Sequence, residues 1–210
     1  MQAPLAVQPS LLDPEGGAPL APLAPVVARI ELTDGAWVDH APGWLPDSDL
    51  LSSLAGGVPW RAERRTMYER IVDVPRLLAF FGEGEALPED RLVAVRDALD
   101  EHYLPALGER LVTAGMCLYR DGRDSVAWHG DTIGRGARED TVVAIVSLGA
   151  PRRFLLRPLS GGPSLRFDLA HGDLLVMGGS CQRTWQHALP KTARQVGARV
   201  SVQFRARGVR

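Results

Sequence analysis

The second half of the chain is divided into short strand-forming segments by frequent glycine, proline and aspartate. From Gly115 onward the sequence predicts eight strands, near residues 115–120, 125–131, 141–148, 152–158, 164–169, 173–178, 181–188 and 198–206. Strands of this length with turn signals between them fit a double-sheet jelly roll. We therefore predict a mixed α/β, mainly β fold, a double-stranded β-helix (jelly roll) with supporting N-terminal helices.

The N-terminal half carries mixed signals. Its segments are a first strand at Val26–Leu32, a turn-rich approach at Ala36–Gly43, a short helix at Pro46–Ala55, strands or an ordered loop at Trp60–Val74 and a longer helix at Pro88–Val112. The longer helix has apolar residues at three- and four-residue spacing. Proline lacks the N–H that a helix interior uses, so Pro105 is expected to break this helix into two pieces.

A chain of 210 residues can bury the core of one domain. Residues 1–25 are rich in alanine and proline and lack a basic start, so we predict a flexible tail and not a signal peptide. Residues 26–210 are then one domain, with an N-terminal extension at 26–114 and the jelly-roll core at 115–206.

No apolar run is long enough to cross a membrane. Two cysteines make no disulfide framework, which indicates a reduced cytoplasmic setting, and we expect a monomer.

Charge is unevenly distributed along the chain. Residues 1–60 hold seven acids and one base, whereas residues 181–210 hold seven bases and no acid, although the formal net charge is −1. Such asymmetry indicates a polyanionic partner. Codon bias is the alternative explanation, because Lys191 is the only lysine.

Two histidines and an aspartate have the composition of a metal site. His129 and Asp131 are two residues apart, so on a strand both side chains point to one face. His187 would complete a set of two histidines and one carboxylate, which suits non-haem Fe(II) with positions left open. A second match, His171-Gly-Asp173, precedes an apolar strand, and Asp173 there is expected to cap a turn. We favour the first match because it follows a strand at its end.

Two arginines on the last predicted strand point to an anionic ligand. Arg199 and Arg205 are six residues apart, so both lie on one face of the strand. Cations that face a barrel interior are costly unless an anion meets them, and a small dicarboxylate would supply that charge. The alternative is that one or both are solvated charges at the strand ends.

Several motifs together resemble the AlkB family of Fe(II)/2-oxoglutarate dioxygenases, which repair alkylated nucleic acid. The motifs, in the family's order, are Tyr119–Asp131, Val146–Gly149, Gly172–Gly178, Trp185–His187 and Arg199–Arg205. The match covers nearly all of residues 115–206. Residues 30–114 resemble the family more loosely, in the region of its nucleotide-recognition lid.

The resemblance implies roles around the iron. His129, Asp131 and His187 would hold Fe(II), with 2-oxoglutarate and O₂ as co-substrates. Arg199 would pair with the distal carboxylate of 2-oxoglutarate, and Tyr119 and Arg205 would contact its remaining oxygens or the edge of the substrate pocket.

The resemblance also implies residues that contact substrate. Trp60 would stack on a flipped base above the imidazole of His129, and Tyr68 would belong to the lid. A core or strand-edge aromatic is the alternative for Trp60, and plain packing is the alternative for Tyr68. Arg135 and Arg138, after the metal strand, would contact phosphates unless they are solvated loop charges.

The sequence departs from the family pattern at a few positions. Cys117, Ser201 and Gln203 stand where the family has asparagine, asparagine and threonine. All three keep the inward parity, so Ser201 remains among the expected co-substrate residues with a changed hydrogen-bond reach. Ile133 stands where the repair enzymes typically place an acid near the base. This leaves the choice of base and the class of substrate open.

The activity implied by the resemblance is oxidative demethylation of N-alkylated bases in alkylated DNA or RNA. Bases such as 1-methyladenine and 3-methylcytosine would be repaired with release of formaldehyde, succinate and CO₂. One alternative is an Fe(II)/2-oxoglutarate hydroxylase of a protein or small molecule. Another is a non-catalytic jelly-roll binding module, against which the intact triad argues.

Overall fold

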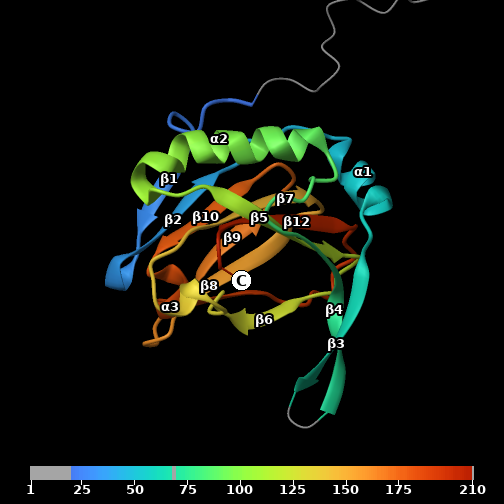
Figure 1. Cartoon of the computed structure of the whole chain (residues 1–210). Helices are drawn as coiled ribbons and strands as arrows, with labels where there is room; N and C mark the ends of the chain where they lie inside the picture. Colours follow the sequence, from blue (N-terminus) through green and yellow to red (C-terminus); the bar gives the residue numbers. More distant parts are fainter. Residues whose placement is uncertain (1–19, 68–69, 210) are drawn as a thin grey trace, which may run out of the picture.

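The strands form two sheets in a computed structural model that describes residues 20–67 and 70–209 (Figure 1). The eight-stranded sheet has, in spatial order, β1 (Ala28–Glu31), β2 (Ala36–Ala41), β10 (Leu174–Gly179), β7 (Val143–Gly149), β12 (Arg199–Ala206), β5 (Leu111–Tyr119), β4 (Arg70–Phe81) and β3 (Arg61–Met67). The four-stranded sheet has β6 (Val126–His129), β11 (Trp185–Leu189), β8 (Arg152–Pro158) and β9 (Leu165–Leu169). The mainly β architecture predicted from the sequence is confirmed.

Helical segments are few and mostly short. They are α1 (Leu50–Gly57), α2 (Asp90–Leu107), α3 (Cys181–Thr184) and the 3₁₀ turns η1 (Thr33–Gly35) and η2 (Arg135–Ala137). In Figure 1, α2 lies along the outer face of the large sheet. None of the helices in the described part of the chain is long and apolar enough to span a membrane.

Alternation along the central strands separates two cores. On β12, Val200, Val202 and Phe204 pack in one cluster with apolar residues of α1 and α2. The other faces of β7 and β10 pack against β8 and β9 in a second cluster between the sheets. Because strand side chains alternate between faces, the neighbours of Val200 and Val202 on β12 face the inter-sheet space. This places the two predicted arginines of β12 on the inner side.

Proline does not break the long helix. The structure has one helix, α2, and Pro105 lies in its last turn. Gly108 ends the helix in the left-handed conformation at φ 71°. The expected division into two pieces is therefore wrong. Because Pro105 lies so close to the C-terminal end of the helix, only a few helical residues follow it, and no second piece can form.

The segment expected to be a turn-rich approach is strand β2. It pairs with β1 on one side and with β10 on the other. The strand was not predicted because it contains a buried aspartate, Asp39. The Asp39 carboxylate accepts two hydrogen bonds from Arg29, at 2.7 and 2.8 Å, and one from the hydroxyl of Tyr103 at 2.9 Å. A polar residue satisfied by partners far along the chain cannot be recognised from local sequence pattern.

Two other predicted boundaries also move. The strand expected at 181–188 begins with a helical turn, α3, and only continues as β11 from Trp185. The tail expected to end at residue 25 is already packed before that point. Leu23 is buried, and the carbonyl of Ala21 accepts the indole N–H of Trp44 at 2.8 Å.

Candidate metal centre

A cavity of about 850 Å³ opens between the two sheets. Strands β4, β5 and β12 of the large sheet line one side, and β6, β8 and β11 of the small sheet contribute to the other. All three predicted metal ligands line this cavity, together with Tyr119, Arg199, Ser201 and Arg205. The structure thus gathers residues that lie up to 86 positions apart, as the separation of Tyr119 from Arg205 shows.

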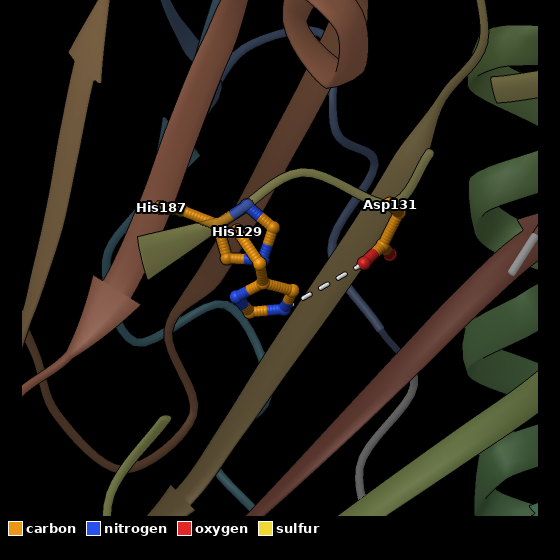
Figure 2. Close-up of side chains that lie close together, drawn as sticks. All are labelled: His129, Asp131 and His187. Atoms are coloured by element: carbon orange, nitrogen blue, oxygen red, sulfur yellow. Dashed lines mark ion pairs between the residues drawn. The ribbon is translucent and has the colours of Figure 1, made fainter. Parts of the chain in front are cut away.

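His129, Asp131 and His187 converge on one point (Figure 2). His129 ends β6 and lies directly opposite His187 of β11 in the strand register. One ligand atom from each of the three side chains lies within 4.8 Å of the others. Nε2 of His129 is 3.8 Å from Oδ1 of Asp131, and the centroids of the two imidazole rings are 4.2 Å apart.

The donor set fits Fe(II). Two imidazoles and one carboxylate on one side of a metal form the facial triad of non-haem iron oxygenases, which leaves positions for co-substrate and oxygen. Nδ1 of His129 lies 2.9 Å from the carbonyl oxygen of Ala127. If Nδ1 carries the proton and donates to that carbonyl, the lone pair on Nε2 points toward Asp131 and a shared metal.

Charge inside the cavity keeps the carboxylate ready for a cation. Burial by itself raises the pKa of Asp131, but the guanidinium of Arg205 and the two histidines outweigh it, and the pKa falls to about 2. Nε of Arg205 is 2.8 Å and Nη2 is 2.6 Å from Oδ2 of Asp131. Burial, with His129 next in effect, lowers the pKa of His187 to about 3. His187 is therefore neutral, as a metal ligand must be, at any physiological pH.

The metal-free protein is expected to lose stability in mild acid through His187. Its folded-state pKa of about 3 is below the ordinary 6.5, so the unfolded chain takes up the extra proton. Stability is then full above pH 6.5 and falls by up to about 1.4 kcal/mol per pH unit toward pH 3, or about 2 kcal/mol at pH 5. Asp131 adds nothing between pH 7.5 and 5, because its contribution is lost only as the pH falls below 3.8 toward 2. Urea unfolding with chelator at pH 7.5, 6.5 and 5 measures the slope.

The matched variant is His187→Gln, which cannot take up this proton. Its stability should fall less steeply between pH 6.5 and 5 than that of the parent. Equal slopes in the two proteins would contradict the assignment, because the remaining histidines are common to both.

Arg199 is a buried cation with an unused donor. Its side chain is only 1% exposed, and burial lowers its pKa. Nε donates to Oγ of Ser147 at 3.0 Å, whereas Nη1 is buried with no hydrogen-bond partner. An unpaired buried guanidinium donor is costly unless an anion meets it, so the site fits a carboxylate such as that of 2-oxoglutarate.

The other predicted co-substrate residues are differently engaged. Tyr119 is buried beside Arg199, whose guanidinium carbon is 5.3 Å from the centre of the phenol ring, and burial raises the pKa of the hydroxyl. Oγ of Ser201 accepts from the side-chain amide of Gln203. Arg205 directs Nε and Nη2 at the metal-ligand Asp131. Contacts of these three residues with co-substrate remain predictions.

Of the predicted substrate residues, the three that the structure describes, Trp60, Arg135 and Arg138, are not in the lining of the cavity. The indole N–H of Trp60 donates to the carbonyl of Leu54 at 3.1 Å, and the ring packs against the core beside the helices. The indole N–H is thus satisfied by α1, as the core alternative expects, and stacking of Trp60 on a base stays a prediction. Tyr68 lies outside the described residues.

The two loop arginines differ from each other. Arg135 is held by Glu109 and Glu139, with contacts of 2.7 to 2.9 Å, and donates to the carbonyl of Arg207. Its charge is paired with two carboxylates of the same chain, so its expected phosphate contact is not supported. Arg138 is exposed, and its role at phosphate remains a prediction.

The cavity presents an aromatic ring that sequence reasoning missed. Phe80 of β4 lines the cavity and is 49% exposed, and Ile133, also in the lining, is 66% exposed. Phe80 pairs with Gly115 of β5, where an added Cβ would lie 2.8 Å from Nη1 of Arg205. The alternation of side chains along β4 could have identified Phe80. The sequence analysis, however, predicted either strands or an ordered loop for residues 60–74 and no secondary structure for residues 75–81.

The second His-x-Asp match is structural. Asp173 accepts the backbone N–H groups of Gly43 and Ala170, each at 2.8 Å, as expected for a turn cap. Nδ1 of His171 accepts the N–H of Gly149 at 2.9 Å, and Nε2 lies 2.9 Å from the carbonyl of Asp47. Both ring nitrogens are used by the backbone, so this histidine has no atom left for a metal.

Known proteins of similar sequence share the chemistry that this geometry indicates. Residues 82–205 match the 2OG-Fe(II) oxygenase superfamily. Alpha-ketoglutarate-dependent dioxygenase alkB homolog 3 of Rattus norvegicus is 30% identical over 224 residues, covering 95% of this chain and 71% of that protein. DNA oxidative demethylase ALKBH2 of Homo sapiens is 29% identical over 148 residues, covering 63% of this chain and 56% of that protein.

Solved structures share the fold at low sequence identity. OsALKBH1 superposes with a TM-score of 0.57 at 16% identity, over 85% of this chain and 99% of that one. A prolyl hydroxylase from Trichoplax adhaerens superposes with a TM-score of 0.58 at 12% identity, over 83% of this chain and 84% of that one.

Proposed function

Since the chain belongs to the AlkB family within the 2OG-Fe(II) oxygenase superfamily, we propose that it oxidatively demethylates N-alkylated bases in DNA or RNA. The observation that carries the proposal is the pairing of the triad with Arg199 in one cavity, in a chain similar to alkB homolog 3 over 95% of its length. The products would be the repaired base, formaldehyde, succinate and CO₂.

Each part of the cavity has a distinct task in this reaction. His129, Asp131 and His187 hold Fe(II), which when bound supplies the chemistry that couples 2-oxoglutarate decarboxylation to C–H hydroxylation. Arg199 grips the distal carboxylate of 2-oxoglutarate through Nη1, which fixes the orientation of the co-substrate. Arg205 keeps Asp131 ionised and directed at the metal.

The substrate base must leave its stack to reach the cavity between the sheets. Extrusion costs least in single strands and at damaged pairs, so these are the expected substrates. Phe80 offers a partly exposed ring to a base that enters. 1-Methyladenine and 3-methylcytosine carry positive charge, so contact with an aromatic face adds a cation–π attraction. Hydroxylation of the N-methyl group then lets its C–N bond break with release of formaldehyde.

Ile133 favours a second candidate, hydroxylation of a protein or small molecule. Its exposed apolar side chain at the cavity offers no hydrogen bond to the amino group of a base. A substrate that presents apolar surface would gain from burying this residue.

Product analysis distinguishes the two candidates. Protein loaded anaerobically with Fe(II) is given 2-oxoglutarate, O₂ and a single-stranded oligonucleotide that contains 1-methyladenine, and succinate and formaldehyde are measured. We expect both products, with formaldehyde absent when an unmethylated oligonucleotide is used. Succinate that is independent of methylation, without formaldehyde, would assign the oxygenase another substrate. No succinate from iron-loaded protein would contradict the demethylase, because its substrate is present in the assay.

A further inference from the structure

We infer that Gln182 is a positioning residue of the metal centre, which fixes the backbone of Asp131 and ties it to the strand that carries His187. Gln182 belongs to α3, the helical turn immediately before β11. The inference rests on the metal site and not on the identity of the substrate. If the protein does not demethylate nucleic acid, the role of Gln182 at the metal site can still be tested by metal binding.

The contact is a single buried hydrogen bond to a metal ligand. Oε1 of Gln182 accepts the backbone N–H of Asp131 at 2.9 Å. The side chain of Gln182 is 1% exposed, and its Nε2 lies 4.0 Å from Sδ of Met177. Water has little access here, so removing Oε1 leaves the N–H of Asp131 without a partner, and such a buried donor favours any shift that finds one.

The backbone of α3 supports the same loop. A Cβ on Gly130, between the two ligands, would lie 2.3 Å from the carbonyl oxygen of Gln182 and 3.3 Å from that of Trp185. The loop that carries Asp131 therefore rests directly on α3, and only glycine allows this approach. His187 follows Gln182 by five residues, so one short segment sets the places of two ligands.

Asp131 is thus held from two directions. Gln182 fixes its main chain, and Arg205 fixes its carboxylate at 2.6 and 2.8 Å. Hydrogen bonds that orient metal ligands typically change metal affinity by about 10- to 100-fold when they are removed. A role limited to packing would instead change stability and leave the metal geometry as it is.

The chain provides a matched control in Gln186. It lies on β11 beside His187, but its Oε1 accepts Nη2 of Arg157 at 3.0 Å and does not line the cavity. Gln182→Met and Gln186→Met make the same chemical change four residues apart. Methionine nearly preserves the volume of glutamine but offers no acceptor for an N–H group beyond a weak thioether.

The test is titration of the full-length chelated protein with Co(II), followed by visible absorption. Gln182→Met is expected to weaken Co(II) binding about 10- to 100-fold and to change the absorption bands that report ligand geometry. Gln186→Met should match the parent in both respects. Gln182→Glu retains an acceptor for the same N–H and should bind Co(II) more tightly than Gln182→Met does. Thermal unfolding of each metal-free variant separates lost stability from lost affinity.

Two results would overturn the inference. One is Co(II) affinity and spectrum of Gln182→Met that equal those of Gln186→Met. The second result concerns a different variant, which is needed if Gln182→Met does not fold. Gln182→Ala, which also removes the acceptor and introduces no bulky side chain, then decides, and parental Co(II) affinity and spectrum in that variant would show that residue 182 does not act on the site.

Discussion

Replacing His129 with alanine is expected to abolish formaldehyde and succinate release, whereas His171→Ala retains both. His129 supplies one of the three metal ligands, and its loss should lower turnover by about a thousand-fold or more, since the metal provides all the oxidising chemistry. The measurement is product formation per mole of folded, iron-loaded protein.

The His171→Ala control removes a histidine from the same kind of motif. His171 bonds the backbone at Gly149 and Asp47, so its loss should cost about 1–3 kcal/mol of stability and change turnover per folded molecule little. Chemical denaturation gives the stability of each variant. Activity that survives in His129→Ala but disappears in stable His171→Ala would reverse the ligand assignment.

The second large effect is expected at Arg199, where affinity and stability should change in opposite directions. In Arg199→Met the KM for 2-oxoglutarate should rise about a hundred-fold or more, because a buried partner of the carboxylate is lost. The metal-free, co-substrate-free protein should become more stable, by about 1 kcal/mol, because the unpaired buried charge is removed and an apolar side chain of similar length fills its place. Steady-state kinetics and urea unfolding measure the two quantities.

Arg152 is the matched control for this substitution. It is also buried, but its guanidinium donates to the carbonyls of Asp121, Asp124 and Pro190 at 2.8 to 3.0 Å. Arg152→Met should therefore destabilise the protein by about 2–5 kcal/mol and leave the KM for 2-oxoglutarate nearly unchanged. If Arg199→Met is destabilised like Arg152→Met and keeps its KM, Arg199 is a structural arginine and the co-substrate lies elsewhere.

Much of the metal site was predictable from local sequence. The two-residue spacing of His129 and Asp131, the strand end at which they lie and the order in which His187 and Arg199 follow needed no coordinates. The alternation of β12 also placed its arginines on the inner face. These features depend on the period of a strand, which is a property of neighbouring residues.

The sequence was uninformative where a polar or amphipathic side chain is satisfied by a partner in another element. Nothing in the sequence around Trp60 shows that its indole N–H donates to the carbonyl of Leu54. The strand β2 reads as a turn because Asp39 is satisfied by Arg29 and Tyr103. In each case the side chain is polar or amphipathic, and only the folded chain shows which group satisfies it.

The sequence alone determined the mainly β fold, the candidate iron ligands and the family, because strand alternation and ligand spacing are properties of short segments. Only the tertiary structure showed that the two arginines of β12 have different partners. Arg205 forms an ion pair with Asp131, whereas Nη1 of Arg199 is buried without a hydrogen-bond partner. It also brought Gln182 to the backbone of Asp131 across 51 residues. The physical reason is that burial and hydrogen-bond satisfaction depend on which strands become neighbours, and that pairing is not local in the chain.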